Sequence, residues 1–129
     1  MSSVLQRRKA QQAELIELGR RFADRARAEL GAVTAWIYGS VARGDFNLWS
    51  DVDVLLVATH LPEDPLERFR LLIHWAPPGV EPKGYTEAEF RRLLQKQTRH
   101  ILAMLRPRIL LVDDLRLEAQ LPPETEAPP

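Results

Sequence analysis

Hydrophobic residues recur at three- and four-residue steps over residues 5–30, and arginine, glutamate and glutamine fill the positions between them. This period predicts one long amphipathic helix with a single core-facing side. Its apolar positions are Leu15, Leu18, Phe22, Ala26 and Leu30. Glycine commonly ends a helix, so we expect this one to stop at Gly31.

Runs of β-forming residues that are too short for a helix predict strands farther along the chain. Residues 33–38 and 51–58 are two such runs. The second is apolar on both faces in its second half, which is typical of a strand covered on both sides. A further strand is expected near 79–84, where Pro82 favours an edge position, and a last one at 108–112.

Two helix-start signals separate these strands. Asp64 can cap a helix that has Pro65 at its first position. Thr86 and Glu89 have the spacing of a capping box, and the hydrophobic period after them predicts one helix that continues to about Leu105. Helices and strands therefore alternate along the chain.

This alternation predicts that residues 1–115 form a single α/β (α+β) domain, with a sheet of about four strands flanked by helices. The chain has 129 residues, of which 45% are hydrophobic, and this is enough to bury a core. Residues 116–129 end in the proline-rich, acidic stretch LPPETEAPP, and we expect them to be a disordered tail.

Composition and charge narrow the class of protein. The 18 basic and 18 acidic residues balance, so the overall charge does not indicate a polyanionic partner. The chain has no cysteine, which excludes a disulfide scaffold and a cysteine-ligated metal site. No apolar run has the character of a signal peptide or the length of a membrane span, so we expect a cytoplasmic protein with no membrane partner.

Two aspartates, Asp51 and Asp53, open a strand that should feed the hydrophobic core. Side chains alternate along a strand, so both carboxylates point to the same side. Two ionised carboxylates this close repel each other, and burying them without a partner would be costly. A divalent cation such as Mg²⁺ would relieve the repulsion. Arginine is the other possible counter-charge, and Arg43 is the one near in sequence.

A Gly-Ser pair lies at the end of the preceding strand, where the chain must turn. Gly39 lets the backbone approach a ligand closely, and a helix or nest that begins at Ser40 would direct free N–H groups at an anion. Arg43 lies about one helical turn farther on, and Gly44 would end that turn. Alone, such a pair is more often a simple turn, but together with the aspartates it indicates a site for a metal-bound nucleotide.

The segment GSVARGDFNLWSDVDVLLV resembles the nucleotidyltransferase signature of the DNA polymerase β superfamily. In that signature a Gly-Ser pair is followed by ten residues and then Asp-x-Asp, which is the spacing from Gly39-Ser40 to Asp51-Val52-Asp53. The short chain is similar to the minimal nucleotidyltransferase (MNT) branch. Members of that branch often act beside an all-helical protein of the HEPN type in toxin–antitoxin modules.

The resemblance implies a mixed sheet and an activity that transfers a nucleoside monophosphate from an NTP to a hydroxyl group, and we expect the transfer of AMP from ATP. It implies that Asp51 and Asp53 hold two Mg²⁺ ions, which stabilise the attacking and leaving oxygens. It also implies that Gly39 and Ser40 bind the β- and γ-phosphates. Arg43 is a further candidate for nucleotide binding.

The third carboxylate of the family is expected on the strand before YTEAEF, where Glu81 is the acid present. Family members usually have aspartate there, so the chain departs from the pattern. Glu81 is interpreted as a metal ligand or general base, and the alternative is a solvated acid on an edge strand. Lys83 could touch a phosphate or be solvated. Trp49 is interpreted as a packing residue of the loop, with a nucleobase platform as the alternative.

Two classes of function stay open on the sequence. The first is an enzyme whose acceptor is a hydroxyl of a protein, such as a tyrosine of a HEPN-type partner, with an RNA end as a less favoured acceptor. The second is a degenerate nucleotidyltransferase domain that acts by binding a partner protein, which the departure at Glu81 favours. The expected partners are a nucleotide and either a HEPN-type protein or a second copy of the chain.

Overall fold

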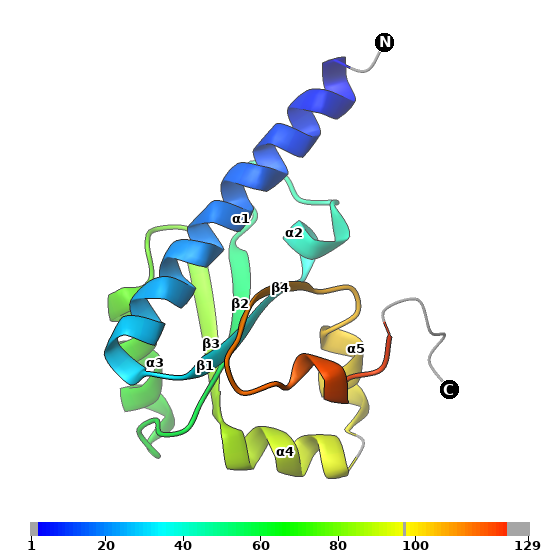
Figure 1. Cartoon of the computed structure of the whole chain (residues 1–129). Coiled ribbons are helices and arrows are strands. Elements are labelled where there is room, and N and C mark those ends of the chain that lie inside the picture. The colour runs from blue at the N-terminus through cyan, green and yellow to red at the C-terminus, as the bar shows by residue number, and fades with distance from the viewer. Residues whose placement is uncertain (1–2, 97, 124–129) are drawn as a thin grey trace.

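The computed structural model describes residues 3–96 and 98–123, and Figure 1 shows their arrangement. The elements, in chain order, are α1 (Ser3–Leu30), β1 (Val33–Tyr38), α2 (Ser40–Arg43), β2 (Val52–Ala58), α3 (Pro65–Trp75), β3 (Val80–Thr86), α4 (Glu87–Gln95), α5 (Arg99–Met104), β4 (Ile109–Asp113) and the 3₁₀ helix η1 (Glu118–Gln120). Although α1 has 28 residues, no helix in the described part of the chain combines the length and apolar character needed to cross a membrane.

The four strands form one mixed sheet in the order β3-β2-β1-β4. Strand β1 pairs antiparallel with both β2 and β4, whereas β2 and β3 are parallel and are joined through α3. The crossover is required because a tight hairpin cannot join parallel strands. The expected fold, a four-stranded mixed sheet flanked by helices with a long N-terminal helix, is confirmed. Pro82 lies on β3, at an edge of the sheet as expected.

Each face of the sheet has its own apolar core, and alternation along β2 divides its residues between them. Val54 and Leu56 belong to the core formed with α1 and α3, which includes Phe22. Leu55 and Val57 belong to the core formed with α4, α5 and η1. Both faces of the second half of β2 are covered by these cores, and this explains why that half is apolar on both faces.

The predicted helix from residue 87 to about Leu105 is wrong in its continuity, because the chain forms two helices there. The capping box at the start of α4 is present: the Thr86 hydroxyl accepts from the Glu89 N–H at 3.2 Å, and the Glu89 carboxylate accepts from the Thr86 N–H at 2.8 Å. Helix α4 then ends at its C-cap, Lys96, and α5 starts after Thr98. The break allows Phe90 of α4 and Ile101 of α5 to be buried in the same core.

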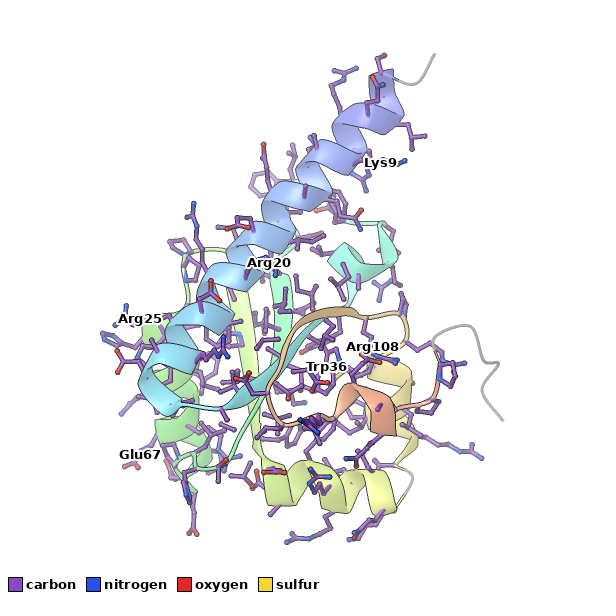
Figure 2. The ribbon with its side chains drawn as sticks, in the orientation of Figure 1. Lys9, Arg20, Arg25, Trp36, Glu67 and Arg108 are labelled. Atoms are coloured by element: carbon purple, nitrogen blue, oxygen red, sulfur yellow. The ribbon has the colours of Figure 1, made fainter. Side chains whose placement is uncertain are left out.

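The prediction of a disordered tail from residue 116 is wrong for residues 116–123, and residues 124–129 lie outside the described residues. Leu117 and Leu121 are buried in the core beneath η1. Between them, Glu118 accepts a hydrogen bond from the Trp36 indole N–H at 2.9 Å and pairs with Arg108 at 2.6 Å. Trp36 and Arg108 lie beside η1 in Figure 2. The composition of this segment, which is rich in proline and acidic residues, did not indicate that Leu117 and Leu121 would be buried.

Candidate active site

A row of three paired residues crosses the sheet where β2 begins. Asp53 is paired with Tyr38 of β1 on one side and with Glu81 of β3 on the other. Directly paired residues present their side chains on the same face of a sheet. That face also carries Trp36 and Leu55, two residues farther along their strands. Trp36 and Leu55 are buried, whereas Asp53 is half-buried and Glu81 is exposed. The acids therefore lie at the solvent-accessible end of this face.

Asp51 immediately precedes β2 and is exposed, two residues from Asp53. Burial raises the pKa of the Asp53 carboxyl, the negative charges of Glu81 and Asp51 raise it further, and the positive charge of Arg43 opposes them. Three acids and one arginine therefore interact at this end of the sheet. The structure brings together the predicted acids Asp51, Asp53 and Glu81, which come from different segments of the chain.

The donor set suits a hard cation, because it consists of carboxylate oxygens that repel one another. Within residues 3–96 and 98–123, however, no three His, Cys, Asp or Glu side chains are gathered closely enough to form a ready-made metal cage. Mg²⁺ usually takes only one or two protein carboxylates and fills its remaining positions with water and phosphate oxygens. Asp51 and Asp53 fit that pattern, and their role as metal ligands stays a prediction.

Gly39 brings the turn after β1 into contact with the Asp53 carboxylate. A Cβ atom added at Gly39 would lie 2.5 Å from Oδ2 of Asp53, closer than any ordinary contact. The backbone of Gly39 also has φ 75° and ψ −151°, a combination that is essentially restricted to glycine. Glycine is therefore needed twice at this position, for the backbone conformation and for the approach to Asp53.

The turn continues into α2, a helix of a single turn. The N–H of Arg43 donates to the carbonyl of Gly39 at 3.0 Å, and the N–H of Gly44 donates to the carbonyl of Ser40 at 2.9 Å. Gly44 ends the helix in the left-handed conformation, as expected. The Arg43 guanidinium is exposed and pairs with Asp45 at 3.2 Å. Its predicted contact with a nucleotide, and that of Ser40, stay predictions.

Tyr38 is a site residue that the sequence did not single out, since it was interpreted as part of the core. It is half-buried, and burial together with the charges of Asp53 and Glu81 raises the pKa of its hydroxyl to about 12. The hydroxyl therefore stays protonated beside the acids at neutral pH. Only the pairing of β1 with β2 reveals this position, and no local sequence pattern encodes it.

The loop between α2 and β2 presents two large apolar side chains to solvent. Leu48 is 87% exposed and Trp49 is 89% exposed. The loop is ordered by its own polar groups, because Asn47 accepts from the Trp49 N–H at 2.8 Å and Ser50 accepts from the Asn47 N–H at 2.9 Å. The interpretation of Trp49 as a packing residue is therefore wrong, because its side chain is exposed to solvent, two residues before Asp51 in the sequence.

Comparison with known proteins identifies the family to which this fold belongs. The family model described as the nucleotidyltransferase domain matches residues 20–116. The chain belongs to this family, and the resemblance drawn from its signature is confirmed at that level. The match begins within α1, so residues 3–19 of that helix precede it.

A solved structure of a candidate nucleotidyltransferase from Sulfolobus solfataricus has the same fold. It aligns with a TM-score of 0.57 at 23% sequence identity, over 66% of this chain and 78% of the other. At this level of identity the likeness concerns the fold. Among curated proteins, no sequence matches the chain.

Proposed function

We propose that this protein is an Mg²⁺-dependent nucleotidyltransferase that transfers AMP from ATP to a hydroxyl group. The observation that carries the proposal is the position of Asp53, which touches the Gly39 turn, is paired with Glu81 and lies two residues from Asp51. The turn that would bind phosphate therefore lies against a group of carboxylates, in a chain of the nucleotidyltransferase domain family.

Each residue has a distinct role in this proposal. Asp51 and Asp53 would hold two Mg²⁺ ions, which when bound supply charge stabilisation at the α-phosphate and at the attacking and leaving oxygens. The Gly39–Ser40 turn would bind the β- and γ-phosphates through backbone N–H groups and the serine hydroxyl. Arg43, which is exposed, would exchange Asp45 for a phosphate oxygen.

Glu81 would act as the general base. The acceptor oxygen forms a bond to the α-phosphorus as the bond to the β-phosphate oxygen breaks, and pyrophosphate leaves. Glu81 takes the proton of the acceptor hydroxyl. Its exposure supports this role, because a base must be reached by an acceptor from outside the chain.

We further propose that the acceptor is a protein hydroxyl, with a tyrosine of a HEPN-type helical protein as the candidate drawn from the signature resemblance. The exposed pair Leu48 and Trp49 supports a protein acceptor, since large apolar side chains exposed in the loop that leads to Asp51 suit a macromolecular surface. ATP and such a partner would both be met in the cytoplasm, which we propose as the site of action. A second candidate is a binding module without catalysis, which the departure from the family's usual aspartate at Glu81 favours.

Label transfer tests the enzyme. Purified protein, Mg²⁺ and ATP labelled at the α-phosphate are incubated with host lysate, beside Asp53→Asn and the matched control Asp24→Asn, which changes an exposed aspartate on α1. We expect one discrete band from the wild type and from the control, loss of the band with EDTA, and at least about 100-fold less label from Asp53→Asn. Equal labelling by Asp53→Asn would refute the proposal. If no protein is labelled while a partner is still captured, the binding module is supported instead.

A further inference from the structure

The N-terminal half of α1 extends past the sheet and runs beside α2 (Figure 1). Residues 3–19 precede the part of the chain that the family model matches. Two polar side chains on this half, Arg8 and Gln12, are one helical turn apart and therefore lie on the same face of the helix. Both are partly buried, whereas most of the residues around them are exposed.

Arg8 binds the loop that leads from α2 toward Asp51. Its Nη2 donates to the carbonyl of Gly44 at 3.2 Å and also to the carbonyl of Phe46. Its guanidinium lies over the Phe46 ring, with Cζ 3.9 Å from the ring centroid, in the geometry of a cation–π contact. Phe46 is itself buried in the core beneath α1.

Gln12 binds α2 itself, because its Nε2 donates to the carbonyl of Val41 at 2.7 Å. The last carbonyls of a helix have no partner within the helix, and in a helix of one turn nearly all of its carbonyls are in this position. A single turn is also not stable alone. The donors on α1 therefore satisfy carbonyls that α2 and the following loop leave free.

We infer that the N-terminal half of α1 is a brace for the nucleotide-binding turn, and that Arg8 and Gln12 are positioning residues of the site. The braced segment, residues 41–46, joins the Gly39–Ser40 turn to the loop that ends at Asp51. Holding this segment restrains the turn at its start and the loop to Asp51 at its end, beyond what the pairing of β1 with β2 already fixes. The inference rests on the proposed function only in assigning the turn to a nucleotide.

Hydrogen exchange of the nucleotide-free protein tests the brace without reference to activity. The variants are Arg8→Met, which keeps the length of the side chain but removes the donors, and Gln12→Glu, which removes the amide donor. Their matched controls are Arg7→Met and Gln11→Glu, which change exposed neighbours on the same helix. We expect about fivefold faster exchange of the amides of residues 41–50 in the first two variants, with β1 and β2 unchanged. The controls should behave as the wild type.

Unchanged exchange at residues 41–50, or equal acceleration throughout the sheet, would overturn the brace. The KM for ATP in the label-transfer assay then tests positioning: we expect it to rise about tenfold in Arg8→Met, with a smaller change in kcat, and to be partly restored in Arg8→Lys. An unchanged KM beside faster exchange would refute the positioning role. If the wild type neither binds nor uses ATP, the proposed function fails, while the exchange measurement still decides the brace.

Discussion

Replacing Gly39 by alanine perturbs the contact on which the candidate site is built. The new Cβ would lie 2.5 Å from Oδ2 of Asp53, and the backbone would have to keep φ 75° and ψ −151°. The variant therefore combines backbone strain with a collision. A control with strain alone is Gly31→Ala, because Gly31 has φ 86° but no atom within 4 Å of an added Cβ.

The expected loss of stability follows from these two contributions. A non-glycine residue held in such a region of backbone conformation costs about 1–3 kcal/mol. Forcing an extra carbon into an occupied position costs typically about 1–3 kcal/mol more. We expect Gly39→Ala to lower the free energy of unfolding by about 2–6 kcal/mol, and Gly31→Ala by about 1–2 kcal/mol.

Urea unfolding followed by circular dichroism measures both values, and a double-mutant cycle isolates the collision. Asp53→Ala removes the carboxylate that Gly39→Ala would strike. The cost of Gly39→Ala should therefore fall by about 1 kcal/mol or more in the Asp53→Ala background. Equal costs at Gly39 and Gly31, together with no coupling to Asp53, would refute the close approach of the turn to the acid.

Three further predictions concern the charges and the core. Because the pKa of Asp53 is raised in the fold, its ionisation opposes folding, so the unfolding free energy should fall as the pH rises from the usual aspartate range through the folded pKa. Asp53→Asn should remove this slope and be more stable than the wild type near neutral pH, by about 1 kcal/mol or less; a less stable variant in urea titrations would contradict the assignment. In Tyr85→Phe, Tyr38 is the one remaining tyrosine, and absorbance titration should still give a pKa above the usual 10, because burial and the charges of Asp53 and Glu81 remain; a value near 10 would show that Tyr38 is neither buried nor beside the acids. Leu117→Ala should lower the unfolding free energy by about 2–5 kcal/mol, against about 0.5 kcal/mol or less for the exposed control Leu48→Ala, and similar losses would mean that residues 116–123 are not part of the core.

The sequence by itself determined the features that depend on neighbouring residues. The spacing from Gly39-Ser40 to Asp51 and Asp53 identified the family signature, and the family match confirms it. The capping signals at Asp64 and Thr86 correspond to observed helix starts. These predictions succeed because a cap or a strand alternation is fixed by contacts within a few residues.

The tertiary structure alone decided which distant residues meet. The pairing of β2 with β1 and β3 places Tyr38 and Glu81 on either side of Asp53, and no local pattern specifies that register. The hydrogen bonds from Arg8 to the loop span 36 and 38 residues. The periodicity of α1 therefore predicted a helix, but not which part of the chain the helix contacts. Such contacts depend on how whole elements pack to bury both faces of the sheet, and this is a property of the complete fold.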